Sequence, residues 1–283
     1  MIDVLVSGAS GFIGRPLVQR LRNIGLSVFE LDRKIGSVID PLTWSDLPEA
    51  KAIVHLAGRT YVPDSWKDSY SFINTNVIGT QNALDYAHKY NAQFVFISAY
   101  LYGRPEELPI SESHRISPNN PYALSKYLAE QLCGFYSAFK NVDIRILRLF
   151  NVYGLGQRED FLIPSILKQI KTKKEIHVLD LYPKRDFIFL EDIINSIISA
   201  LSFRKGLHTF NIGSGISYSV EEVISMAQEV AGTNLPVISA RSERKEEISD
   251  VVANITKAKR ELGWNPKWSF RMGLFEIWKS LMF

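Results

Sequence analysis

The sequence predicts an α/β protein built on a doubly wound parallel sheet with helices on both faces. Short apolar strands alternate with helical patterns through the first half of the chain, the first strand runs into a glycine-rich turn, and that turn opens a helix. The 283 residues, of which 46% are hydrophobic, suffice for a substantial core in one domain or in two unequal ones.

The first strand is predicted at residues 2–7, and glycines follow it at the spacing GxxGxxG. A helix is expected from the last of these glycines to about Asn23. Glycine lets the backbone turn sharply and approach a pyrophosphate, whose charge is held by the amides at the helix N-terminus. The residues expected to bind a dinucleotide here are Gly8, Gly11, Phe12, Ile13 and Gly14.

The second strand, residues 26–31, is followed by one acidic and two basic residues. Asp32 stands where a carboxylate accepts hydrogen bonds from the adenosine ribose of a dinucleotide. Arg33 and Lys34 offer positive charge for a 2′-phosphate, and solvated turn charges are the alternative interpretation. This strand end therefore predicts NAD or NADP as the cofactor and leaves the choice between them open.

The third strand, residues 52–56, ends in small residues that let the backbone pass close to a cofactor. Asp40, in the excursion before this strand, has two interpretations: a contact to the adenine, or the start of an Asp-Pro turn. The cofactor contacts expected from this region are Asp40, Leu56, Ala57 and Gly58.

A fourth and a fifth strand complete the alternation that is typical of a Rossmann-type sheet. A helix is predicted over residues 69–90, a strand over 94–97 and another strand over 143–149. Ser98 falls at the C-terminal end of the fourth strand, and open parallel sheets place their ligands at that edge.

Tyr122 and Lys126 place a phenol and an ammonium one helical turn apart. Pro121 suits a first helical turn, and the apolar-rich run through Phe139 continues the helix. Side chains at this spacing share one face, so both can point into one pocket. A nearby cation lowers the pKa of a tyrosine, which lets the phenol exchange a proton with an alcohol as hydride leaves its carbon. A surface Tyr and Lys at helical spacing is the alternative.

Motifs spread over nearly the whole chain resemble one enzyme family. An extended short-chain dehydrogenase/reductase is indicated by Gly8 to Gly14, His55-Leu56-Ala57-Gly58, Ser98 with Tyr102-Gly103, and Tyr122 to Lys126. The nucleotide-sugar epimerase/dehydratase branch of that family is similar in its later motifs, which here are Leu149 to Gly154, Arg185-Asp186-Phe187, Asn211 to Gly215 and Leu262-Gly263-Trp264.

The resemblance implies an NAD(P)-dependent oxidoreductase that acts at a sugar carbon, expected to be C4, of a nucleotide-diphosphate sugar. The catalytic set carried over by motif is Ser98, Tyr122 and Lys126, with Asn76 as a supporter at the active-site helix that also belongs to the expected cofactor contacts. Tyr122 and Lys126 are expected to contact the cofactor as well, Lys126 through the nicotinamide ribose. An epimerase and a 4-ketoreductase both remain open.

One departure from the family pattern bears on the reaction. The family's 4,6-dehydratases place an acidic residue, often an Asp-Glu pair, directly after the Ser or Thr, where this chain has Ala99 and Tyr100. Dehydration needs a base for one proton and an acid for the leaving hydroxyl, which these neutral groups do not readily supply. Dehydratase activity is therefore disfavoured, and it stays an alternative together with a non-catalytic dinucleotide sensor.

The resemblance also implies a smaller, discontinuous C-terminal α/β domain that binds the nucleotide sugar. The expected division is residues 1–152 and 187–212 for the dinucleotide, and 153–186 and 213–283 for the substrate. The expected substrate contacts are Ser98, Asn151, Arg185 and Arg244. Arginine presents a planar fork to phosphate oxygens, although Arg244 lies in a charge run, and such a run is more often a solvated surface.

Composition excludes several other classes of function. The net charge of +3 arises from 33 basic and 30 acidic side chains without a polybasic tract, so neither nucleic acid nor an anionic membrane is indicated as a partner. Cys133 is the single cysteine, and the five histidines form no metal-binding motif, so no metal site is expected. The acidic start and the lack of a long apolar run predict a cytoplasmic protein.

A homodimer is expected from the helices at 69–90 and 122–139. Both carry apolar residues on more than one stripe, and one stripe suffices for packing on the sheet. The family commonly dimerises through a four-helix bundle of these helices, and a thickly covered core helix is the alternative. The residues of the second stripe include Leu124, Leu128, Leu132, Phe135 and Phe139.

Overall fold

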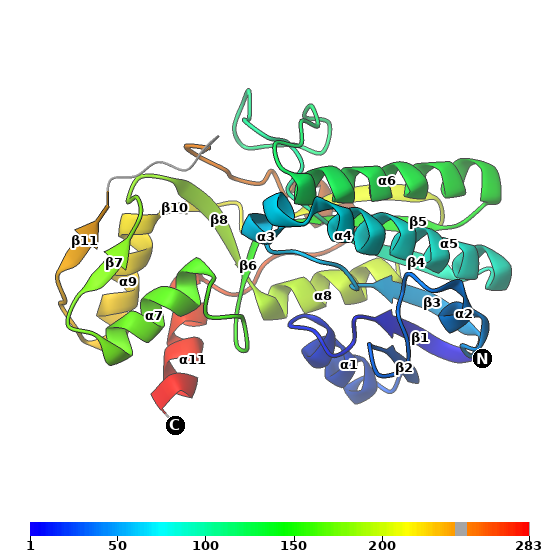
Figure 1. Ribbon diagram of the computed structural model, residues 1–283, viewed down its shortest axis with the longest axis horizontal. Helices are drawn as coiled ribbons and strands as arrows, with labels where there is room; N and C mark the ends of the chain where they lie inside the picture. Colours follow the sequence, from blue (N-terminus) through cyan, green and yellow to red (C-terminus); the bar gives the residue numbers. More distant parts are fainter. Residues whose placement is uncertain (241–247, 283) are drawn as a thin grey trace.

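The computed structural model of the chain describes residues 1–240 and 248–282. Six parallel strands form its largest sheet in the order β2-β1-β3-β4-β5-β9 (Figure 1). The strand order reverses beside β1, as in a doubly wound sheet. The strands are β1 (Ile2–Ser7), β2 (Val28–Leu31), β3 (Ala50–His55), β4 (Gln93–Ala99), β5 (Ile144–Leu149) and β9 (Leu207–Ile212). The predicted Rossmann-type α/β fold is confirmed.

Helices cover both faces of this sheet because each strand buries side chains alternately on its two sides. Val4 and Val6 pack in the core under α1 (Gly14–Asn23) and α8 (Leu190–Leu201). Leu5 points the other way, into the core under α5 (Gly79–Tyr90) and α6 (Pro121–Lys140). The short helices α2 (Pro41–Ser45) and α10 (Thr256–Glu261) pack against α5 and β9, respectively.

The region predicted as one helix over 69–90 is three consecutive elements. They are α4 (Ser69–Ile73), a π-helical turn η1 (Asn74–Ile78) and α5, and the short α3 (Val62–Lys67) precedes them. The fourth strand is longer than predicted, because β4 continues past Ile97 to Ala99. Ser98 consequently lies inside the strand, in register with Arg148 of β5.

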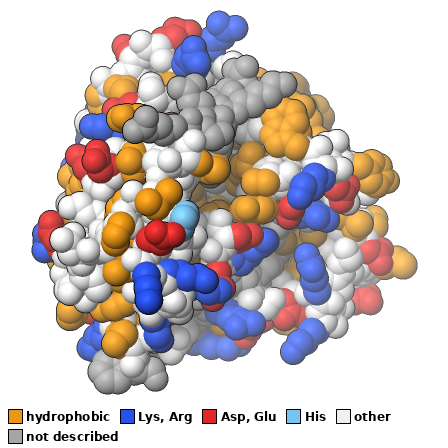
Figure 2. All heavy atoms as spheres, turned by 60° about the vertical axis from the view of Figure 1, so that its left-hand side comes forward, with side chains coloured by type: hydrophobic (Ala, Val, Ile, Leu, Met, Phe, Trp, Pro, Cys, Tyr) orange, Lys and Arg blue, Asp and Glu red, His pale blue; other side chains and the backbone are white. Residues whose placement is uncertain are grey.

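A smaller lobe stands beside the C-terminal edge of the large sheet (Figure 1). In it β8 (Lys184–Phe189) pairs parallel with β6 (Asn151–Tyr153) and antiparallel with β10 (Ser217–Ser219), and β7 (Ile176–Val178) pairs with β11 (Val237–Ser239). A separate core of aliphatic and aromatic side chains joins its helices α7 (Leu162–Thr172), α9 (Val220–Ala231) and α11 (Phe270–Met282). Acidic and basic side chains are interspersed on the face that this lobe presents (Figure 2).

The buried carboxylate of Asp186 joins the smaller lobe to the end of the large sheet. It accepts hydrogen bonds from the backbone N–H groups of Ser214 (2.6 Å), Gly215 (3.0 Å) and Ala253 (3.0 Å), and from the Ser214 hydroxyl (2.7 Å). Burial raises the pKa of Asp186, while these donors act in the opposite direction. Asp186 thus has a structural role, because its hydrogen bonds join β8 to the turn after β9.

Within residues 1–240 and 248–282, no helix is both long and apolar enough to cross a bilayer. Among the same residues, no group of three or more His, Cys, Asp and Glu side chains is arranged to hold a metal ion.

Candidate active site

The glycine-rich turn between β1 and α1 is packed so tightly that two of its glycines, Gly8 and Gly14, have no room for a side chain. Gly8 has φ of +75°, and a Cβ built there would lie 2.8 Å from the backbone nitrogen of Ala57. A Cβ on Gly14 would overlap the carbonyl oxygen of Gly8. The sequence prediction grouped this turn with the strand end at Leu56 and Ala57, and the structure brings the two segments into contact.

A cavity of about 600 Å³ lies at this turn, lined by Ser10, Gly11, Phe12 and Arg15, by further residues of α1, by Leu155 and Gly156, and by the end of β8 and the start of α8. Helix α1 begins there without a side-chain cap and without an acidic residue in its first turn. Arg15, at the second position of the helix, adds a positive charge to the positive end of the helix dipole. A cavity, a helix N-terminus without a side-chain cap and a cation form a set that fits the pyrophosphate of a dinucleotide.

The acidic residues expected near the adenosine take part in local turns. Asp32 accepts a hydrogen bond from the backbone N–H of Lys34 at 2.9 Å, and Arg33 is exposed beside it. Asp40 caps helix α2 by accepting from the backbone N–H of Leu42 at 3.0 Å. Of the two interpretations of Asp40, the structure shows the turn, and the contact to adenine stays a prediction.

Helix α6 has Pro121 in its first turn, as the sequence predicts, and the structure adds Asn120 as its cap. One turn later Lys126 is 4% exposed, and its Nζ donates to the carbonyl oxygen of Ile97 at 2.6 Å. Burial lowers the pKa of Lys126 to about 8. The ring of Tyr122 lies edge-on to Phe72, with 6.3 Å between the ring centroids.

The electrostatics of Tyr122 differ from the expected picture. Burial raises the pKa of Tyr122 above that of a free tyrosine, and this is the sole cause of its shift. The expected lowering by Lys126 is therefore absent from this structure. The physical reason is that the Lys126 ammonium is directed to the Ile97 carbonyl and the face of the Phe96 ring.

Asn76, in the π-helical turn, holds three parts of the site together. Its Oδ1 accepts from the backbone N–H of Arg59 at 2.8 Å, and its Nδ2 donates to the Arg59 carbonyl at 3.0 Å and to the Ser125 hydroxyl at 2.8 Å. A Cβ added to Gly58 would lie 2.9 Å from Asn76 Oδ1 and 3.8 Å from Lys126 Nζ. Gly58, Asn76 and Lys126, predicted separately, are thus brought together.

Ser98 is placed differently from the expectation of an accessible hydroxyl. It is 3% exposed, and its Oγ donates to Oε1 of Glu130 at 2.6 Å. Glu130 in turn forms a buried ion pair with Arg148. Glu130 and Arg148 are not among the residues predicted from the sequence, although a carboxylate two turns after Tyr122 and an arginine inside the apolar strand IRILRL are signals of a buried pair.

Two of the predicted substrate contacts, Asn151 and Arg185, lie at the junction of the two lobes. Asn151, which begins β6, donates to the carbonyl of Asp186 at 3.3 Å. Arg185 donates through Nη1 to the carbonyls of Lys184 and Ile248, each at 2.7 Å. Arg244 lies outside the described residues.

Tyr100 occupies the position at which the family's dehydratases carry an acid. Its hydroxyl donates to the Gly103 carbonyl at 2.5 Å. Burial raises the pKa of Tyr100, and the charge of Arg185 opposes this shift. Neither Tyr100 nor the buried Ala99 supplies the carboxylate that dehydration requires.

Known proteins are similar to this chain over nearly its whole length. The chain is 31% identical over 295 residues to GDP-6-deoxy-D-talose 4-dehydrogenase of Aggregatibacter actinomycetemcomitans, covering 99% of this chain and 98% of the relative. It is 30% identical over 300 residues to a putative UDP-glucose 4-epimerase of Methanocaldococcus jannaschii, covering 97% and 96%. The structure of RMD from Pseudomonas aeruginosa complexed with NADPH superposes with a TM-score of 0.91 at 28% identity, covering 99% of this chain and 100% of the other.

The family profile extends over the glycine-rich turn, the Tyr122 and Lys126 pair and the six strands of the large sheet. It matches residues 4–213, which is most of the chain. With this match and relatives of at least 30% identity along nearly the whole length, the chain belongs to the NAD dependent epimerase/dehydratase family.

Proposed function

We propose that this protein is an NAD(P)-dependent oxidoreductase that acts at C4 of a nucleotide-diphosphate sugar, as an epimerase or as a 4-ketoreductase. The observation that carries the proposal is the buried Lys126, which lies beside Gly58 and Asn76 and one helical turn from Tyr122. Relatives that are a 4-dehydrogenase and a putative 4-epimerase of nucleotide sugars support C4 as the reacting carbon.

Tyr122 and Lys126 of α6 have different roles in the proposed reaction. Tyr122 exchanges a proton with the sugar oxygen, and its raised pKa keeps the phenol protonated until a bound ligand changes its surroundings. Lys126 holds the nicotinamide ribose, for which its ammonium turns from the Ile97 carbonyl. The nicotinamide, when bound, accepts or supplies the hydride.

The choice between epimerase and reductase rests on what happens to the cofactor. An epimerase returns the hydride to the same sugar carbon and keeps its cofactor, whereas a reductase consumes reduced cofactor once per turnover. Asp32 favours NAD and the exposed Arg33 favours NADP, so both cofactors belong in the test.

The proposed substrate site lies between the large sheet and the smaller lobe. We assign residues 1–152 and 187–212 to the dinucleotide and residues 153–186 and 213–283 to the nucleotide sugar. Arg185 and Asn151, at the junction, are the proposed contacts to the diphosphate, together with Arg244. Arg185 must exchange a carbonyl partner for a phosphate oxygen on binding, which a charge-assisted hydrogen bond favours.

A second copy of the chain is the proposed partner of α6. Leu124, Leu128, Phe135 and Phe139 are all exposed on this helix, at 45%, 37%, 51% and 73%. Their spacing sets them on one stripe opposite the buried Ala129 and Cys133. Two copies of this stripe, packed antiparallel, would remove the apolar surface from water as an isologous dimer.

The decisive experiment incubates the purified protein with UDP-, GDP- and dTDP-hexoses and their 4-keto forms, in the presence of NAD, NADP or their reduced forms. Products are separated by anion-exchange chromatography, and reduced nicotinamide is followed by its absorbance. C4 epimers or C4 alcohols support the proposal. A 4-keto-6-deoxy product would instead identify a dehydratase, and cofactor binding without turnover of any sugar would identify a sensor.

A further inference from the structure

The connection between β6 and α7 (Figure 1), residues 154–161, reaches the large sheet at two separate strand ends. At the end of β1, Leu155 and Gly156 line the same cavity as the glycine-rich turn. After the end of β3, Phe161 lies against the ring of Tyr61, the residue that precedes α3. Residues 154–161, called the strap below, therefore join the smaller lobe to both places.

Two ring contacts hold the strap at Tyr61. Phe161 meets Tyr61 edge-on, with 5.7 Å between the ring centroids, and the guanidinium carbon of Arg158 lies 4.9 Å from the centroid of the Tyr61 ring. Asp160 pairs with Arg158 through both carboxylate oxygens, at 3.2 Å and 2.5 Å, which orients the guanidinium. Both contacts depend on the ring of Tyr61, so removing that ring frees this end of the strap.

The polar contacts of the strap do not oppose such a movement. Within the part of the chain that the structure describes, its hydrogen bonds and ion pairs run to its own residues, to β6 or to α7, as from Gln157 Nε2 to the Val152 carbonyl at 2.8 Å. Gly156, at φ of +80°, has open space where a Cβ would be. A segment with few buried contacts opens at a low free energy.

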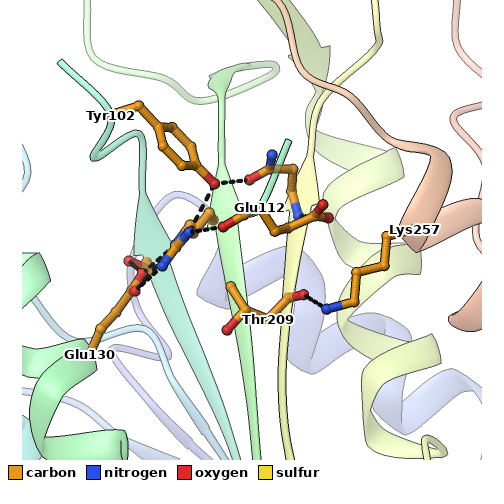
Figure 3. A network of polar contacts seen from close by, with 8 residues as sticks. Tyr102, Glu112, Glu130, Thr209 and Lys257 are labelled. Carbon is orange, nitrogen blue, oxygen red and sulfur yellow. Dashed lines mark hydrogen bonds and ion pairs between the residues drawn. The ribbon is translucent and has the colours of Figure 1, made fainter. Parts of the chain in front are cut away.

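The opposite wall of the proposed site is fixed. Glu130 of α6 forms an ion pair with Arg148 of β5 at 2.6 Å, the two side chains are 4% and 6% exposed, and a polar network extends from Arg148 to the Tyr102 hydroxyl (Figure 3). Lys126, one turn before Glu130, is buried too. Helix α6 therefore stays on the sheet, because moving it would leave buried charges unpaired.

The two anchors of the strap coincide with the two ends of the proposed cofactor site. The pyrophosphate is assigned to the cavity at the glycine-rich turn, and the nicotinamide ribose to Lys126, whose Nζ lies 3.8 Å from a Cβ built on Gly58. Tyr61 follows Gly58 by three residues. We infer that the strap closes over the dinucleotide and that Tyr61 is the positioning residue that holds it closed, so the cofactor enters and leaves only while this contact is broken. The inference deepens the proposed function and rests on its cofactor site.

This arrangement has a kinetic signature. A contact that closes the strap without touching the cofactor changes opening equally in the free and the bound protein, so it alters the association and dissociation rate constants by one factor and leaves Kd unchanged. An edge-on ring pair and an exposed cation–π contact together shift the opening equilibrium by about 5- to 60-fold. An epimerase can keep the strap closed through many turnovers, whereas a reductase must open it in each one.

Stopped-flow fluorescence of NADH and NADPH binding to the full chain measures both rate constants. Tyr61→Ala should raise both by about 5- to 60-fold and leave Kd within about twofold, whereas Tyr61→Phe keeps the ring and should match wild type. Arg158→Ala removes one of the two contacts from an exposed position, so it should give a smaller equal rise and serves if Tyr61→Ala does not fold. Tyr70→Ala, at a 75% exposed tyrosine of α4, is the matched control and should change nothing.

A rise in the dissociation rate constant alone, with affinity lost in proportion, would make Tyr61 an ordinary cofactor contact and overturn the inference. Unchanged rate constants in Tyr61→Ala would overturn it as well. If the cofactor binds but no nucleotide sugar reacts, the proposed function fails by itself, and the rate constants still decide the role of the strap. Wild type that binds neither NADH nor NADPH would overturn both.

Discussion

At the scale of single residues, the site combines buried charges with side chains whose partners are backbone groups. Lys126 and Tyr122 are both shifted by burial toward their neutral forms. A neutral phenol beside a lysine with a pKa of about 8 is suited to proton exchange near neutral pH once a ligand draws the ammonium toward the reacting centre. Burial in the folded chain therefore shifts both pKa values before any ligand binds.

The first prediction concerns Tyr122→Phe. The ring still packs edge-on to Phe72 and only the transferable proton is lost, so kcat should fall by about 100- to 10,000-fold while affinities for cofactor and nucleotide sugar stay within about twofold. Kinetics with any nucleotide sugar found to react, together with binding titrations, measure both quantities. Near-normal turnover in this variant would exclude Tyr122 as the proton-transfer residue.

The second prediction is an acid sensitivity that originates at His55. The imidazole is fully buried against Phe94 and Phe96, its Nδ1 lies 2.7 Å from Ser7 Oγ, and burial lowers the pKa of His55 to about 3. The unfolded chain binds this proton near pH 6.5, so stability is fully present above that pH and is lost as the pH falls toward 3. His55 should account for a loss of roughly 2 kcal/mol between pH 7 and pH 5.

Urea unfolding of wild type and of His55→Phe at both pH values measures this contribution. The variant loses the hydrogen bond to Ser7 but fills the same space between aromatic rings, so it should be less stable at pH 7 and less sensitive to acid. An identical fall in the free energy of unfolding between the two pH values in both proteins would show that His55 is not the group that titrates.

At the scale of elements, the π-helical turn η1 explains why one predicted helix became three segments. The extra residue per turn rotates Asn76 into the buried site, where it reaches both the strand-end loop at Arg59 and the start of α6 at Ser125. A regular helix would carry the residues after this point at a different angle. The turn therefore couples the helix pair to the segment that follows β3.

The third prediction tests that coupling. Asn76→Ala removes three hydrogen bonds from a buried position and leaves their partners unpaired, so it should lower the free energy of unfolding by about 2 to 4 kcal/mol. Cofactor affinity should fall too, because the Gly58 loop and Lys126 lose their common support. Gln81→Ala, exposed one turn further along, is the control and should stay within about 0.5 kcal/mol of wild type.

At the scale of the whole molecule, the two lobes meet at β6, β8 and the segment after β9. The buried Asp186 carboxylate holds this junction through hydrogen bonds to Ser214 and Ala253, and the charge of its neighbour Arg185 acts on the pKa of Tyr100, which follows β4. Any ligand that joins the two lobes there contacts groups from both. The proposed catalytic residues of α6 and the proposed diphosphate contacts Asn151 and Arg185 are thus far apart in the chain, and the proposal requires that one ligand reach both.

The fourth prediction concerns assembly. Replacing Phe135 and Phe139 together by Ser removes the two largest exposed side chains of the α6 stripe, so the protein should sediment as a monomer where wild type sediments as a dimer. Phe275→Ser, an equally exposed phenylalanine on α11, is the matched control and should leave the dimer intact. A monomeric wild type, or a dimer that survives the double substitution, would contradict the proposed interface.

Local features were predictable from the sequence because their cause lies within a few neighbouring residues. The glycine spacing, the start of α6 at Pro121, and the one-turn separation of Tyr122 and Lys126 depend on backbone geometry that the adjacent residues impose. The alternation of apolar strands with helices predicted the Rossmann-type sheet for the same reason.

The partners of polar side chains were decided only by the tertiary structure. Ser98 donates to Glu130, 32 residues away, Asn76 reaches Ser125, 49 residues away, and Lys126 turns to Ile97, 29 residues back along the chain. A hydroxyl, an amide and an ammonium each have several acceptable partners, and the sequence pattern does not rank them. Which partner is met depends on how strands and helices are stacked, and that stacking alone determined that Ser98 faces a carboxylate of α6.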